Sequence, residues 1–117
     1  MNKIYVVVRD DLDPGDQLAQ AVHAAFAYGN TDPQGVDAWI HGENNVVVLA
    51  VPSEQELARL AAKIHADMGA LHVEIREPDL ADELTAIAVE QSAERLLSSL
   101  PLALGRRLLE RRFRPTG

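Results

Sequence analysis

DPGDQLAQAVHAAFAY, residues 13–28, has the pattern of a helix that directly follows a strand. The preceding run Ile4–Val8 is apolar at consecutive positions, which is typical of a strand buried on both faces. Asp13 is suited to cap the helix, and Pro14 to its first position, where a missing N–H costs nothing. Apolar residues then recur at helical spacing and predict a buried stripe made of Leu18, Ala21, Val22, Ala25 and Phe26.

The rest of the chain continues this alternation of strands and helices. Ser53-Glu54-Gln55-Glu56 matches a capping box and predicts that a helix begins at Ser53. Apolar runs and alternating patterns predict further strands, and helical spacing predicts further helices; the strands are 46–51, 72–76 and 84–89, and the helices are 34–41, 53–68 and 91–97. The order β-α-α-β-α-β-β-α predicts a single α/β domain with a four-stranded mixed β-sheet flanked by helices.

Length and composition exclude several classes of protein. A chain of 117 residues fits one domain. It contains no cysteine, which excludes thiolate zinc sites, cysteine nucleophiles and disulfide scaffolds. The apolar run near the N-terminus is too short for a signal peptide or a membrane span. We therefore expect a soluble, cytoplasmic protein.

The charge is distributed unevenly along the chain. The formal net charge of −7 argues against a general affinity for nucleic acid. Five of the 11 basic residues nevertheless lie in the segment 106–114. These arginines, next to Leu108, Leu109 and Phe113, could contact phosphate or a membrane surface. The alternative, which the commonness of solvated termini favours, is that the segment has no binding role.

Four side chains form a candidate catalytic group. In an α/β sheet, ligands gather at the carboxyl ends of parallel strands and at the following helix N-termini. The predicted helix carries Gln20 and His23 on one face, the third strand leads to Glu77, and the last strand carries Thr85. His23 is the candidate base, Glu77 its carboxylate partner, Gln20 a donor or acceptor, and Thr85 a hydroxyl.

Each of these residues also has an ordinary structural interpretation. A single histidine among alanines is often a packing or surface side chain. The acidic loop that begins at Glu77 resembles many solvated turns, and Thr85 is a usual strand residue.

Two parts of the chain together resemble a known family. Residues 4–12, Gly15 and residues 19–25 (AQAVHAA) are similar to the opening of the type 2 peptidyl-tRNA hydrolase family, with its strand ending in R-x-D-L and its A-A-Q-C-S-H-A-A helix. The run 46–52 with Glu54 and Glu56-Leu57 resembles its second strand and P-x-E-x-E-L helix start. We expect a family-like domain over residues 1–104 and a basic extension over 105–117.

The resemblance implies hydrolysis of the ester that joins a peptide to tRNA, with no metal or cofactor. The resemblance implies that His23 and Thr85 fall on a histidine and a threonine linked to activity. Gln20 falls on the glutamine before that histidine, and Glu77 falls where an aspartate linked to activity is expected. The family's lysines at the helix start are replaced by Pro14 and Asp16. We expect the basic extension to provide the RNA contact in their place, through Arg106, Arg107, Arg111 and Arg112.

Partners and alternatives follow from the same features. The expected partner is tRNA or peptidyl-tRNA, with no membrane association. An edge strand and the apolar C-terminal residues are compatible with a homodimer. The alternative to an enzyme is a non-catalytic binding module on the same scaffold, which recruits a protein partner.

Overall fold

The computed structural model describes residues 3–105, and these form one four-stranded β-sheet with helices on both faces. The strand order is β2-β1-β4-β3. β1 pairs in parallel with β2 and antiparallel with β4, which pairs antiparallel with β3. The strands are β1 Lys3–Arg9, β2 Asn45–Val51, β3 His72–Glu77 and β4 Glu83–Glu90. This confirms the predicted α/β fold with a mixed sheet.

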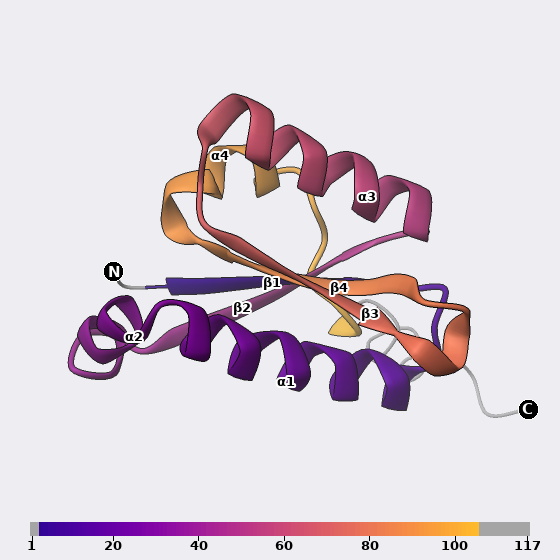
Figure 1. Ribbon diagram of the computed structural model, residues 1–117, viewed down its shortest axis with the longest axis horizontal. Helices are drawn as coiled ribbons and strands as arrows, with labels where there is room; N and C mark the ends of the chain where they lie inside the picture. Colours follow the sequence, from indigo (N-terminus) through magenta and orange to yellow (C-terminus); the bar gives the residue numbers. More distant parts are fainter. Residues whose placement is uncertain (1–2, 106–117) are drawn as a thin grey trace, which may run out of the picture.

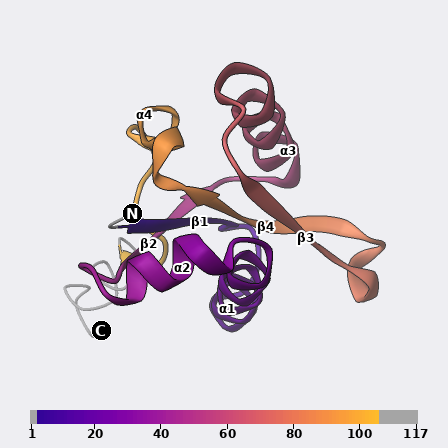
Figure 2. The ribbon, with the colours of Figure 1, turned by 60° about the vertical axis from the view of Figure 1, so that its left-hand side comes forward.

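The helices form two layers around the sheet (Figure 1). On one face lie α1 (Pro14–Thr31) and α2 (Pro33–Ile40), and on the other lie α3 (Glu54–Lys63) and α4 (Glu94–Leu97). Figure 2 shows the same arrangement from the side, with α1 and α3 on opposite faces. Short π- and 3₁₀-helical turns span Ile64–Met68, Pro78–Leu80 and Gln91–Ala93. Within residues 3–105, no helix combines the length and apolar character that crossing a membrane requires.

The core consists of two apolar clusters separated by the sheet. The run Ile4–Val8 of the inner strand β1 is buried on both faces, as its sequence predicts. The expectation that the run beginning at Val46 is equally buried was wrong for its first half, since Val46 is 48% exposed. The reason is that β2 is an edge strand, and within residues 3–105 its outer edge pairs only with residues 101–103.

The predicted buried stripe of α1 was wrong for its large residues. Leu18, Val22 and Phe26 are exposed, and the helix instead buries Gln17, Ala21, Ala24 and Tyr28. Both sets have helical spacing, one residue apart, which corresponds to a rotation of about 100° around the helix axis. Small residues face the sheet at the centre of the contact, so α1 can lie close to it.

The two predicted helix caps have different outcomes. Ser53 accepts a hydrogen bond from the Glu56 N–H at 3.2 Å, which confirms the start of α3. Asp13 occupies the N-cap position of α1, but its side chain makes no capping bond. Only the Asp13 main-chain carbonyl takes part, by accepting from the Gln17 N–H at 2.9 Å.

Candidate active site

Thr85 reaches α1 because the sheet contains a β-bulge at this residue. Ile75 of β3 pairs with Ala86 of β4, whereas the next residue, Arg76, pairs with Leu84. Thr85 is therefore the extra residue on β4, and a bulge of this kind locally redirects a strand's side chains. The Thr85 side chain is fully buried, and its hydroxyl lies 2.8 Å from the Gln20 Oε1 atom and 3.2 Å from the Ile75 carbonyl.

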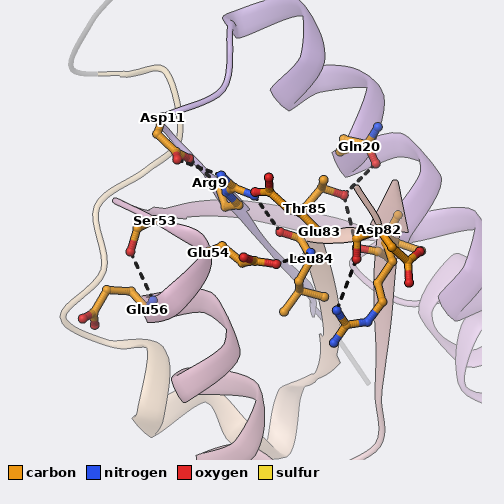
Figure 3. A network of polar contacts seen from close by, with 12 residues as sticks. Arg9, Asp11, Gln20, Ser53, Glu54, Glu56, Asp82, Glu83, Leu84 and Thr85 are labelled. Atoms are coloured by element: carbon orange, nitrogen blue, oxygen red, sulfur yellow. Dashed lines mark hydrogen bonds and ion pairs between the residues drawn. The ribbon is translucent and has the colours of Figure 1, made fainter. Parts of the chain in front are cut away.

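Gln20 connects this buried hydroxyl to the end of β3. Its Oε1 atom accepts from Thr85, and its Nε2 atom donates to the Glu77 carboxylate at 3.1 Å. The Glu77 carboxylate also accepts from the Asp79 N–H at 3.4 Å and so caps the turn that follows β3. Figure 3 shows Gln20 pointing from α1 toward Thr85. Three of the four predicted site residues are thus brought together in one network.

A small cavity of about 200 Å³ opens beside this network. Its lining includes the carboxylates of Asp16, Glu77 and Asp79, together with Gln20, Leu12 and Leu80. The sequence placed Asp16 on the same helix face as Gln20, four residues away, and the cavity lining confirms this position. Asp79 was missed as a lining residue.

His23 lies on the same side of α1, three residues after Gln20. Its side chain is exposed, and no hydrogen bond or ion pair links it to another part of the described chain. The predicted contact between His23 and Glu77 is therefore not formed, because Gln20 donates to the Glu77 carboxylate instead. His23 is next to the network without being one of its members.

Arg9 forms a second polar cluster, which sequence reasoning missed (Figure 3). Its buried guanidinium donates to both carboxylate oxygens of Asp11, at 3.0 and 2.8 Å, and to Glu83 at 2.7 Å. This contact holds the pKa of the Asp11 carboxyl below its ordinary value. Arg9 also donates to the Leu84 carbonyl at 3.1 Å, and the Leu84 N–H donates to Glu54 at 2.8 Å. The cluster thereby fixes the backbone directly before Thr85.

Metal binding has no support in the described residues. Within 3–105, no group of three or more His, Asp or Glu side chains is placed to hold a metal ion.

The comparison with protein families connects this geometry to a known group of enzymes. Residues 2–99 match the family described as Peptidyl-tRNA hydrolase PTH2. The chain belongs to this family. A comparison with curated proteins found no match. The match spans the whole sheet and both helical layers, and membership of the peptidyl-tRNA hydrolase family suggests a hydrolase that acts on peptidyl-tRNA.

The start of α1 differs in charge from what the peptidyl-tRNA hydrolase resemblance implies. Pro14 and Asp16 are exposed at the helix start, where the resemblance implies lysines. Because Asp16 also lines the cavity, this entrance is acidic. The arginines predicted to contact RNA, Arg106, Arg107, Arg111 and Arg112, lie outside the described residues.

Proposed function

We propose that this chain hydrolyses the ester between a peptide and the 3′-terminal ribose of tRNA, with His23 activating the water. The observation that carries the proposal is the network of Gln20, Glu77 and Thr85 beside a cavity, with His23 adjacent on the same helix face. The family membership supports the choice of substrate.

The reaction requires one proton acceptor and one group that stabilises negative charge. The His23 imidazole takes a proton from water, whose oxygen attacks the ester carbonyl carbon. The bond from this carbon to the ribose 3′-oxygen then breaks, and the imidazolium returns its proton to that oxygen. The products are the free peptide acid and tRNA with a 3′-hydroxyl.

Gln20 is the proposed donor to the carbonyl oxygen that becomes negative. One N–H of its amide is used by Glu77, and the second is the donor offered to the substrate. Thr85 and Glu77 hold the two ends of the amide, so its orientation is fixed before the substrate binds. Both are positioning residues in this proposal.

Binding of tRNA needs positive charge that residues 3–105 provide only sparsely. We propose that Arg106, Arg107, Arg111 and Arg112 contact the tRNA phosphates. We also propose that the protein acts in the cytoplasm, where peptidyl-tRNA is formed during translation. Deletion of residues 106–117 should weaken tRNA binding and reduce its salt dependence, because fewer counterions are released.

The proposed function is tested by the release of peptide from a purified N-blocked aminoacyl-tRNA. The wild-type protein should release the acyl group, and Gln20→Leu should lower kcat/KM by about 100-fold, the usual effect of losing one donor to an oxyanion. Gln55→Leu is the matched control, because Gln55 is an exposed glutamine on α3. Absence of release by the wild-type protein would contradict the proposal.

The acidic cavity favours a second candidate, a non-catalytic module that binds a protein partner. Asp16, Glu77 and Asp79 would suit a basic peptide better than a phosphate. Under this alternative, a basic peptide binds in a salt-sensitive way, Glu77→Gln weakens the binding, and tRNA does not compete. Competition by tRNA would favour the enzyme.

A further inference from the structure

An exposed apolar stripe runs along α1, on the side away from the candidate active site network. It consists of Leu18, Val22 and Phe26, which are 58%, 56% and 76% exposed. The spacing of four residues places them on one line about 12 Å long. We name these three residues the α1 stripe. Exposed apolar side chains gathered in this way often mark a surface that binds another protein segment, a membrane or a ligand.

The stripe lies between two hollows with mainly apolar linings. The first has a volume of about 460 Å³ and is formed by Phe26 together with Ala25, Gly29, Asn30 and Val36. The second has a volume of about 200 Å³ and includes Leu18, Val48, Ala103 and Leu104 in its lining. Phe26, at one end of the stripe, lines the first hollow, and Leu18, at the other end, lines the second.

Gln17, one of the residues that line the second hollow, has a polar atom that is unpaired within residues 3–105. Gln17 is 1% exposed, and its Nε2 atom donates to the Leu12 carbonyl at 2.7 Å. Its Oε1 atom is buried and receives no hydrogen bond from the described residues. A buried acceptor without a donor destabilises the folded protein.

The described chain ends at this hollow. The Ala103 N–H donates to the Val48 carbonyl at 2.9 Å, which attaches residues 101–103 to the outer edge of β2. Leu104 then turns with φ of 66° and lines the hollow together with Leu18. In Figure 1 the yellow end of the described chain emerges on the α1 side of the sheet.

We propose that residues 106–117 dock on the α1 stripe, with Leu108, Leu109 and Phe113 covering it. These twelve residues span about 18 Å as a helix or about 40 Å if extended, and either length exceeds the stripe's own length of about 12 Å. The docking does not rest on the proposed hydrolase activity, although the same segment carries the arginines that we propose contact tRNA.

Charge favours this occupant over a second copy of the chain. Residues 1–105 hold 17 of the 18 acidic residues, so two such bodies repel each other. The segment itself carries five arginines against the single acidic residue Glu110 and is attracted to the same body. The contact of residues 101–103 with β2 also occupies part of the edge that a homodimer would use.

The test uses a spin label, because the chain has no cysteine of its own. A nitroxide on Thr116→Cys of the full chain should broaden the amide signals of residues 18–26 in the nuclear magnetic resonance spectrum. The broadening should disappear in Thr116→Cys with Leu109→Asp and Phe113→Asp. The control Arg111→Ser and Arg114→Ser, with the same label, keeps the apolar residues and should retain most of it.

Two results would overturn the proposal. The first is wild-type broadening that is absent along residues 18–26 or unchanged by Leu109→Asp and Phe113→Asp. The second is broadening of residues 18–26 that appears only when two preparations are mixed, one with the spin label and no ¹⁵N, the other with ¹⁵N and no spin label. Such broadening would show that a second copy of the chain lies on the stripe. Unchanged dispersion of the other amide signals verifies that the variants fold, because none of the substituted positions lies in the sheet or helices described.

Discussion

The Thr85 hydroxyl and the Gln20 side-chain oxygen lie 2.8 Å apart and join β4 to α1 across 65 positions of sequence. The contact depends on the β-bulge that makes Thr85 the extra residue of β4. It lies in the interior, where a polar group without a partner is costly. The pairing of β3 with β4 therefore helps to set the orientation of the Gln20 amide, through this bond.

Replacing Thr85 by valine should reduce both stability and activity. Valine keeps the shape of the side chain but removes the donor to Gln20 and Ile75. We expect the free energy of unfolding in urea to fall by about 1–3 kcal/mol. Thr31→Val is the control, because the exposed Thr31 hydroxyl only donates to the Ala27 carbonyl near the end of α1. Equal stability losses in the two variants would contradict the role of the buried bond.

Two substitutions of Glu77 separate its geometry from its charge. Glu77→Gln retains an oxygen that accepts from the Gln20 amide, whereas Glu77→Ala leaves this amide unsupported. We expect peptide release within about threefold of wild type for Glu77→Gln and a loss of tenfold to 100-fold for Glu77→Ala, since misplaced catalytic groups cost rates of this size. Comparable loss in both variants would show that the negative charge itself is needed.

The Arg9–Asp11 contact predicts a pH-dependent contribution to stability. Because Arg9 lowers the pKa of the Asp11 carboxyl in the folded protein, the contribution is present above the unfolded pKa of about 3.9. It is lost as the pH falls through the folded value. Since the Asp11 side chain is 41% exposed, Asp11→Asn should cost less than about 1 kcal/mol at pH 7.

The measurement is urea unfolding of wild type and Asp11→Asn at several pH values. The difference between them should shrink below pH of about 4. Asp13→Asn is the control, because the Asp13 side chain makes no capping bond. A difference for Asp11→Asn that stays constant from pH 7 to about 2.5 would contradict the contribution of the ion pair.

Alanine substitutions at two glycines should act in opposite directions. A Cβ atom at Gly35 would collide with the Asp32 carboxylate, which accepts from the Gly35 N–H at 3.1 Å and caps α2. A Cβ atom at Gly15 meets nothing within 4 Å. We expect Gly35→Ala to lower the free energy of unfolding by about 1–2 kcal/mol and Gly15→Ala to raise it by about 0.5 kcal/mol. Similar stability of the two variants would contradict this packing.

The order and type of the main elements could be predicted because each has a local signal. Ile4–Val8 is continuously apolar, and Ser53 begins a capping motif. The orientation of α1 could not be predicted in this way. Two sets of residues, one beginning at Gln17 and the other at Leu18, both recur at helical spacing. Only packing against the sheet decides which set is buried.

The candidate site could be predicted in part. Gln20, Glu77 and Thr85 do meet, but the bulge that turns Thr85 toward α1 depends on how β3 and β4 pair. The sequence also could not show that Glu77 would accept from Gln20 and not from His23, because this depends on how α1 packs against the end of β3. The buried Arg9 cluster was missed because charged residues at the end of a strand usually face solvent.

The most direct test of the proposed chemistry is the rate of peptide release from N-blocked aminoacyl-tRNA by His23→Ala. We expect kcat/KM to fall by at least about 100-fold, the usual contribution of a general base, with tRNA binding and the unfolding transition unchanged. His41→Ala, which removes an exposed histidine at the end of α2, should retain wild-type activity. Release by His23→Ala at the wild-type rate would contradict the assignment of His23 as the base.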